Sequence, residues 1–243
     1  SNFVCYFQLY LGGIVVGRLF GAKDLGYYLR AYGLKSLPTS YATMIVTDVM
    51  VSSLAALRDN PDQMRAAYSK ALRLTAFVGC PAGALLWPMA PEAVQLLYGS
   101  QWEGAVPLVR IFSVAAVALP ISTSTIWLFL AMGNVRAQLK MNVLLTALIV
   151  VGYWAAIKMG RSLEFYVAFE ALMYAFPFTF LNLYVSHRIC GISLSGTLRV
   201  LSPILGVSFF VAALLTYMSP FFEGRGWMFV LLSKAVSGLG LYI

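Results

Sequence analysis

The sequence predicts an all-α integral membrane bundle of about eight transmembrane helices. Of its 243 residues, 60% are hydrophobic and only 11% are charged, whereas ordinary soluble domains carry roughly 25% charged residues. The apolar residues form continuous runs, as membrane helices require, and do not alternate as barrel strands would. This composition excludes a soluble enzyme, a secreted disulfide-rich module and a nucleic-acid-binding domain. The net charge of +8 comes from basic residues that mostly flank the apolar runs.

The chain divides into spans because a bilayer core of about 30 Å needs about 20 apolar residues per helix. The predicted spans cover residues 1–17, 27–57, 72–86 with an irregular continuation to 98, 111–135, 141–157, 165–186, 200–222 and 227–243. Between them, Asn60 followed by Pro61 predicts a capped helix start. Gly99 and Gly133 predict helix stops. Pro91 predicts the start of a separate short helix at the membrane interface.

Both ends of the chain fall inside apolar runs, so we expect a fragment of a larger protein. No basic region precedes the first run, which argues against a signal peptide. The basic residues of the connections divide equally, eight and eight, between the two sides of the membrane. Charge alone therefore leaves the orientation open.

Two acidic residues lie inside predicted spans, where ionisable side chains are costly and therefore candidates for function. Asp48 lies near the middle of the second span and Glu170 lies in the sixth. Both are candidates for coupling to an ion. For Asp48 the alternatives are a charge pair with a neighbouring helix or a place closer to the membrane interface. For Glu170 the alternative is an interfacial position.

Three cations, Arg18, Arg30 and Lys35, flank the connection between the first two spans. Such cations can hold a phosphate-bearing headgroup, Arg through paired hydrogen bonds and Lys as a point charge. Arg73 and Arg110 are further candidates. The alternative is that these side chains extend toward lipid phosphates, with the neighbouring tyrosines as an interfacial aromatic belt.

The sequence contains no motif of a known catalytic centre. It has no HExxH, GxSxG, DxD or P-loop string and no nucleophile with an adjacent base. Its three cysteines are an odd number without CxxC spacing, which indicates neither a disulfide framework nor a zinc site. We therefore expect no catalytic residue, no metal and no cofactor.

Four strings occur in order along the chain: GRLFGAKDLGYY at 17–28 followed by RAY and LP, RAAYSKALRL at 65–74, LLYGSQW at 96–102 and AVPL at 105–108. They resemble strings of bacterial polysaccharide flippases of the multidrug/oligosaccharidyl-lipid/polysaccharide exporter superfamily, in particular the lipopolysaccharide and exopolysaccharide branch. From residue 140 onward only hydropathy agrees with that family. Ser52 stands where the family usually has Pro, and Asp48 where it often has a small or basic residue.

The resemblance implies an architecture of two six-helix lobes that face each other across a central cavity, sometimes with two added C-terminal helices. This chain would be the second lobe, a single membrane domain over 1–243. Six core helices would occupy 1–186, and two additional helices would occupy 198–243, the last one truncated, with the first lobe missing. The family layout starts this lobe on the cytoplasmic side of the bacterial inner membrane.

The implied function is flipping of an undecaprenyl-pyrophosphate-linked oligosaccharide by alternating access. The expected partners are that lipid-linked oligosaccharide, membrane lipids and the first lobe, with no nucleic acid. The cations named above would contact the headgroup. Alternatives are a multidrug or cation antiporter or a peptidoglycan-lipid flippase of the same superfamily, a membrane-embedded polymerase or glycosyltransferase, and a non-catalytic subunit of a larger export complex.

Overall fold

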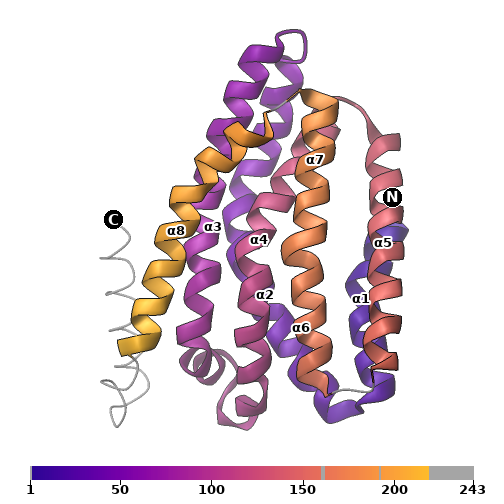
Figure 1. The fold of residues 1–243 in the computed structure, drawn as a ribbon, viewed down its shortest axis with the longest axis vertical. Coiled ribbons are helices and arrows are strands. Elements are labelled where there is room, and N and C mark those ends of the chain that lie inside the picture. Colours follow the sequence, from indigo (N-terminus) through magenta and orange to yellow (C-terminus); the bar gives the residue numbers. More distant parts are fainter. Residues whose placement is uncertain (1, 160–161, 192, 219–243) are drawn as a thin grey trace.

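A computed structural model describes residues 2–159, 162–191 and 193–218, and helices are the only regular secondary structure in these ranges. In chain order they are α1 (Asn2–Leu19), α2 (Ala22–Ala56), α3 (Pro61–Tyr98), the 3-10 helix η1 (Ser100–Ala105), α4 (Val106–Ala131), α5 (Val135–Lys158), α6 (Leu163–Met173), the π-helical turn η2 (Tyr174–Phe178), α7 (Thr179–Cys190) and α8 (Leu194–Met218). The long helices run up and down the bundle in turn (Figure 1). The predicted all-α class is confirmed for these ranges.

Five stretches are long and apolar enough to cross a membrane, and they correspond to the third to seventh predicted spans. They are Pro61–Tyr98, Ser100–Ala131, Arg136–Lys158, Leu163–Arg188 and Leu194–Met218. The first predicted span contains a shorter apolar helix, Tyr10–Leu19. The second is α2, which is not among the five because it carries charged and hydroxyl side chains along its length. The predicted eighth span, 227–243, lies outside the described residues.

The predicted helix boundaries around α3 and α4 are confirmed. The Asn60 side chain accepts a hydrogen bond from the Gln63 backbone N–H at 3.3 Å, and Pro61 opens α3. Gly99 and Gly133, with φ of 90° and 65°, follow the ends of α3 and α4. These left-handed values suit glycine, which has no Cβ to clash with the backbone.

The predicted separate helix at Pro91 is wrong, because α3 continues through three prolines to Tyr98. Proline removes one backbone hydrogen bond, but neighbouring helices can compensate for that loss in a membrane bundle. Here Pro81 and Pro88 are both buried within the bundle. Tertiary packing therefore overrides the local helix-breaking signal.

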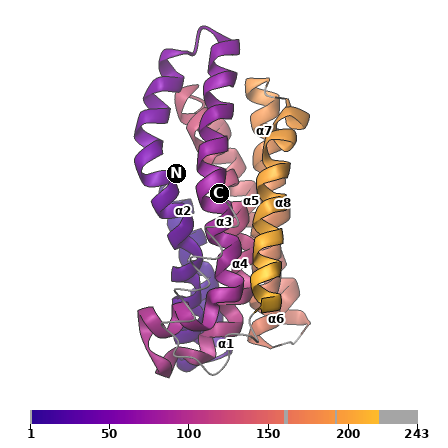
Figure 2. The ribbon, with the colours of Figure 1, turned by 90° about the vertical axis from the view of Figure 1, so that its left-hand side faces the viewer.

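Helix α4 lies at the centre of the bundle and contacts α2, α3, α5, α6 and α7. Helices α1 and α5 lie on one side of it, and α8 lies on the other side against α3 (Figures 1 and 2). Helices α3 and α4 approach each other closely at Gly83, where a Cβ would lie 2.7 Å from the carbonyl carbon of Ala116 and the nitrogen of Val117. Small residues at such crossings let membrane helices pack backbone to backbone.

The interior has two main buried clusters, one above the other along the bundle. The upper one joins mainly α3, α4 and α8 and includes Tyr68, Leu72, Trp127, Leu128 and Leu201. The lower one, near the ends where α2, α4 and α6 begin, joins the first six α-helices and includes Tyr28, Leu34, Phe112, Tyr153 and Tyr166. The lower cluster surrounds a pair of buried charges.

The hairpin of α2 and α3 extends beyond the rest of the bundle at its upper end (Figures 1 and 2). At 1.5 Å per residue, the 35 residues of α2 and the 38 residues of α3 make helices of about 52 Å and about 57 Å. Both lengths exceed the bilayer core of about 30 Å. A part of this hairpin must therefore lie outside the hydrocarbon region.

Candidate functional site

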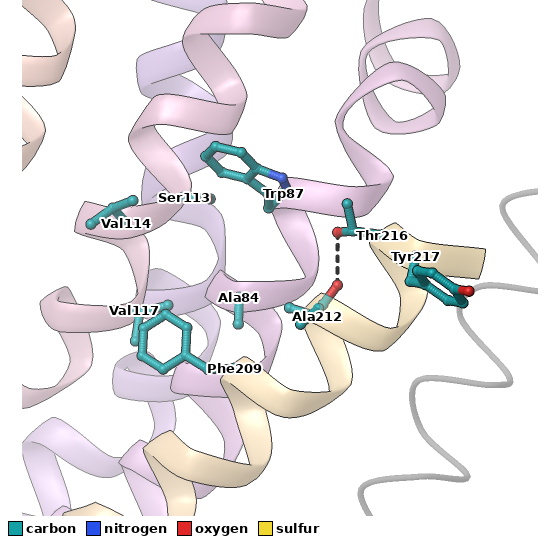
Figure 3. Close-up of a pocket in the computed structure, with 10 residues that line it drawn as sticks. Ala84, Trp87, Ser113, Val114, Val117, Phe209, Ala212, Thr216 and Tyr217 are labelled. Carbon is teal, nitrogen blue, oxygen red and sulfur yellow. Dashed lines mark hydrogen bonds between the residues drawn. The ribbon is translucent and has the colours of Figure 1, made fainter. Parts of the chain in front are cut away.

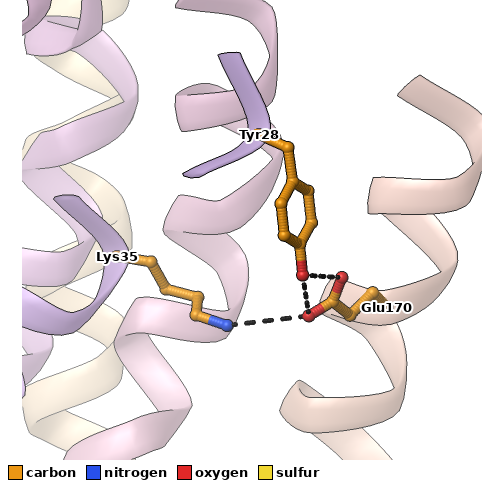
Figure 4. Close-up of polar contacts among 3 residues, drawn as sticks. All are labelled: Tyr28, Lys35 and Glu170. Atoms are coloured by element: carbon orange, nitrogen blue, oxygen red, sulfur yellow. Dashed lines mark hydrogen bonds and ion pairs between the residues drawn. The ribbon is translucent and has the colours of Figure 1, made fainter. Parts of the chain in front are cut away.

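A buried charge cluster, formed by Tyr28, Lys35 and Glu170, lies between α2 and α6 (Figure 4). The Lys35 Nζ lies 3.9 Å from Glu170 Oε1, and both side chains are only 2% exposed. The Tyr28 hydroxyl donates to Glu170, at 3.1 Å from Oε1 and 3.0 Å from Oε2. Since 3.9 Å is longer than a direct N–H···O hydrogen bond, Lys35 and Glu170 are held by charge attraction and not by a tight hydrogen bond.

Three aromatic rings surround the Lys35 ammonium. Its Nζ lies 3.7 Å from the ring centroid of Tyr32, 4.6 Å from that of Phe112 and 4.7 Å from that of Tyr174. The electron-rich face of an aromatic ring attracts a cation, most strongly where water is excluded. The ammonium is therefore stabilised by one carboxylate and three rings instead of by solvent.

Helical spacing brings these side chains to one place. Tyr28, Tyr32 and Lys35 follow at intervals of four and three residues on α2, so they share one face of that helix. Glu170 and Tyr174 are four residues apart across α6 and η2. Packing of both helices against α4 then brings the two faces together.

The charge cluster allows an exchange of partners. An anionic group that reached Lys35 would replace Glu170, while a proton or another cation at Glu170 would replace Lys35. Either event changes the charge balance inside a membrane bundle, where an unpaired charge is costly. Such a pair is the kind of element that can exist in two arrangements with different partners.

The other predicted headgroup residues do not join this cluster. Arg18, Arg30 and Arg110 are exposed at the end of the bundle where α1 stops and where α2 and α4 begin. Arg73 is exposed on α3, nearer the opposite end. Asp48 lies on α2, and its side chain is outside the described part of the structure. The roles assigned to these residues remain predictions.

The sequence analysis named Lys35 and Glu170 separately and missed their pairing. It also missed Tyr28 as a partner of Glu170 and the three rings around Lys35. One signal was present: the second predicted span holds the cation Lys35 and the sixth holds the anion Glu170, and ionisable residues inside membrane spans usually pair with each other.

Two apolar pockets flank α8. One, of about 590 Å³, lies between α3, α4 and α8, with Trp87, Val117 and Phe209 among its lining residues (Figure 3). The second, also about 590 Å³, is lined by α4, η2, α7 and α8 and shares Val117 and Phe209 with the first. No Lys, Arg, Asp or Glu lines either pocket. These linings suit hydrocarbon chains and not charged groups.

A comparison with protein families shows which known proteins the chain resembles. A family profile described as "Polysaccharide biosynthesis protein" matches residues 1–107. Over this part of its length the chain is similar to polysaccharide biosynthesis proteins. This confirms the resemblance inferred from the sequence strings, the first three of which lie entirely inside the matched residues.

Individual curated proteins are similar to parts of the chain. The lipopolysaccharide biosynthesis protein WzxC of Escherichia coli (strain K12) is 25% identical over 169 residues, which are 68% of this chain and 34% of that protein. The teichuronic acid biosynthesis protein TuaB of Bacillus subtilis (strain 168) is 25% identical over 104 residues, 43% of this chain and 22% of that protein. The succinoglycan biosynthesis transport protein ExoT of Rhizobium meliloti (strain 1021) is 25% identical over 111 residues, 45% of this chain and 22% of that protein.

The matched region thus spans about a third or less of the length of these curated relatives. No solved structure matches the chain. The matching family profile includes Tyr28 and Lys35 but ends before Glu170. The charge cluster therefore joins the matched part of the chain to the part that follows it.

Proposed function

We propose that the chain is the second lobe of a flippase, a transporter and not an enzyme, in lipopolysaccharide or exopolysaccharide biosynthesis. It would move an undecaprenyl-pyrophosphate-linked oligosaccharide from the cytoplasmic to the outer leaflet of the bacterial inner membrane. The similarity to WzxC and to the transport protein ExoT supports this proposal. The observation that carries it is the charge cluster, because an ion pair buried in a membrane bundle marks a functional site by default.

In the proposed mechanism, the lipid-linked oligosaccharide enters a cavity between this lobe and the first one. The exposed Arg18, Arg30, Arg73 and Arg110 attract the pyrophosphate. Inside, the pyrophosphate competes with Glu170 for Lys35, and a proton or another cation compensates Glu170. The exchange favours one arrangement of the lobes over the other, which is what alternating access requires. The lipid tail stays in the bilayer, beside apolar surfaces such as those around α8.

The proposed orientation places the loop between α2 and α3 in the cytoplasm and η1 outside. The family layout implied by the sequence strings supports it. Burial of Lys35 also removes one cation from the outer connections, so that eight basic residues remain on the inner side and seven on the outer side. The difference is small, but it has the sign that the positive-inside rule requires.

The headgroup role is tested by Arg30→Ala and Lys35→Ala in the full-length protein, expressed in cells that lack the natural gene. We expect each variant to lower surface polysaccharide, because each removes a cation that would contact the pyrophosphate. Arg58→Ala is the matched control, since Arg58 is an exposed cation in the α2–α3 loop at the far end of the bundle. Unchanged surface polysaccharide in both Arg30→Ala and Lys35→Ala would show that the headgroup role is wrong.

Transport itself is measured in proteoliposomes, from the protection of a lipid-linked oligosaccharide against a reagent outside the vesicles. The proposal expects protein-dependent flipping of that lipid. Transport of a cationic drug without flipping of the lipid-linked oligosaccharide would show that the protein is a multidrug antiporter and not a flippase. The lobe assignment has its own test, because the coding sequence upstream must then encode six further spans.

A further inference from the structure

A small pocket of about 210 Å³ opens at the end of the bundle where α2 begins. We call it the end pocket. Its lining comes from the first turns of α2 and from η1: Ala22, Lys23, Gly26, Tyr27, Gln101 and Trp102. It lies at the ends of the candidate spans α3 and α4. It is therefore open to the aqueous side of the membrane, and it shares no lining residue with the apolar pockets around α8.

Two aromatic rings form a corner in the end pocket. The Tyr27 and Trp102 rings stand nearly perpendicular, at 84°, with centroids 6.1 Å apart. Gly26 allows the indole to approach α2, since a Cβ there would lie 3.1 Å from Trp102 Cζ3. The two rings are thus fixed by packing. Together they provide a rigid surface of large area that has apolar faces and polar edges.

Two cations lie against these rings. Lys23 Nζ lies 5.8 Å from the Tyr27 centroid, and the Arg30 guanidinium carbon lies 4.7 Å from the Trp102 centroid and 5.1 Å from that of Tyr98. Within the described ranges neither cation has a carboxylate partner. The neighbouring acids, Asp24 and Glu103, are not paired with them. Lys23 and Arg30 are therefore held in place and available to an anion.

We propose that the end pocket binds one acidic sugar residue, a hexose that carries a carboxylate, of the transported oligosaccharide. This inference rests on the proposed flippase function. The C–H face of a pyranose ring packs on the aromatic corner, because such a face is apolar. Gln101 offers an amide that both donates and accepts hydrogen bonds to sugar hydroxyls. The sugar carboxylate pairs with Lys23 or Arg30.

The other occupant to consider is a lipid headgroup, for which aromatic residues at a membrane interface would form a belt. Such a belt residue is present on α5, where Trp154 is 62% exposed and lies beside Lys158, whose Nζ is 5.7 Å from a Trp154 ring centroid. That pair lines none of the described pockets. Trp102, in contrast, is partly buried, packed on another helix and part of a concave site. The pair of Trp154 and Lys158 is therefore the matched control for the pair of Trp102 and Lys23.

The test uses the full-length protein in nanodiscs of phosphatidylcholine, titrated with a trisaccharide that contains one glucuronate. The comparison ligand is the same trisaccharide with the carboxylate reduced to an alcohol. We expect the acidic form to bind about tenfold more tightly, as one charge-assisted contact supplies. Trp102→Ala and Lys23→Gln each weaken binding of the acidic form by about tenfold. Trp154→Ala leaves it unchanged.

Equal affinity for the two trisaccharides, or no binding of either, overturns the inference. So does a loss in Trp154→Ala as large as that in Trp102→Ala, because the effect would then belong to the interfacial belt. Lys23→Gln guards against misfolding, since it changes only an exposed side chain. Flipping by the wild-type protein without any preference for the acidic sugar defeats this inference and leaves the proposed function intact. A wild-type protein that flips neither lipid-linked sugar defeats both.

Discussion

At the scale of single residues, the contributions of Lys35 and Glu170 to the stability of the protein should depend on each other. Lys35→Met leaves a buried carboxylate, and Glu170→Leu leaves a buried ammonium, so each single variant should lose about 3–5 kcal/mol of stability. The double variant removes both charges and should recover most of that loss. The measurement is the unfolding of the purified protein in detergent, with all three variants compared as a double-mutant cycle.

Asp62 and Arg65 provide the control for this cycle. Their ion pair is shorter, at 3.2 Å between Oδ1 and Nη1, but Asp62 is 91% exposed and Arg65 is 43% exposed. An exposed pair of this kind contributes less than about 1 kcal/mol. Asp62→Asn should therefore be nearly silent. A double variant of Lys35 and Glu170 that is no more stable than either single variant would contradict the coupling.

The sequence contained part of the information about this site. A charge in an apolar span was sufficient to name Glu170, a group of cations around one connection was sufficient to name Lys35, and helical spacing places Tyr28 on the same face as Lys35. What spacing could not supply is the rotation of α2 relative to α6, because Tyr28 and Glu170 are 142 positions apart in the chain. That rotation is set by packing of both helices on α4, which no local pattern reveals.

At the scale of helices, the contact between α3 and α4 depends on the absence of a side chain at Gly83. Gly83→Ala would place a methyl group 2.7 Å from backbone atoms of Ala116 and Val117, and backbone cannot move aside as a flexible side chain can. We expect the variant to be about 1–3 kcal/mol less stable. Thermal unfolding in detergent would measure the loss.

Gly206 is the matched control on α8. A Cβ at Gly206 meets nothing within 4 Å, so Gly206→Ala gains only the better helix propensity of alanine, up to about 1 kcal/mol. The two substitutions add the same methyl group in two helices. If both had the same effect, the close approach of α3 and α4 would not be the cause.

Helix boundaries were predictable where the signal is a local N-terminal cap, and not where the signal is a helix-breaking proline. The start of α3 at Pro61 follows from hydrogen bonding within four residues around Asn60. Pro91 misled because its local effect is outweighed by packing of α3 against α2, α4 and α8. Pro177 does disturb its helix, since it lies in the π-helical turn η2, so the effect of a proline depends on its surroundings.

At the scale of the whole molecule, the proposed orientation predicts which ends react with reagents outside the cell. Ser100→Cys, at the start of η1, should react with a membrane-impermeant maleimide on intact cells. Asp59→Cys, in the α2–α3 loop, should react only after the cells are permeabilised. Both positions are exposed, and the native Cys80 is buried, so it adds little background once Cys5 and Cys190 are replaced by serine. The reverse labelling pattern would show that the lobe has the opposite orientation in the membrane.

Composition was sufficient to predict the class of the molecule but not its layout. Apolar content predicted a membrane bundle, and five predicted spans became long apolar helices. The second predicted span differs because α2 combines an apolar run with cations and hydroxyl groups. Lys35 faces partners inside the protein, whereas Lys23 and Arg30 are exposed, and a hydropathy scan cannot tell a buried polar side chain from a solvated one.

The overhang of the α2–α3 hairpin has a mechanical consequence. Its two helices are continuous from the charge cluster to the tip outside the hydrocarbon region, and Gly83 ties α3 closely to the central helix α4. If Lys35 exchanges partners as proposed, a small tilt of α2 at the charge cluster would therefore produce a larger displacement at the tip. A spectroscopic label near Arg58 would register that tilt as a displacement larger than any at the site itself.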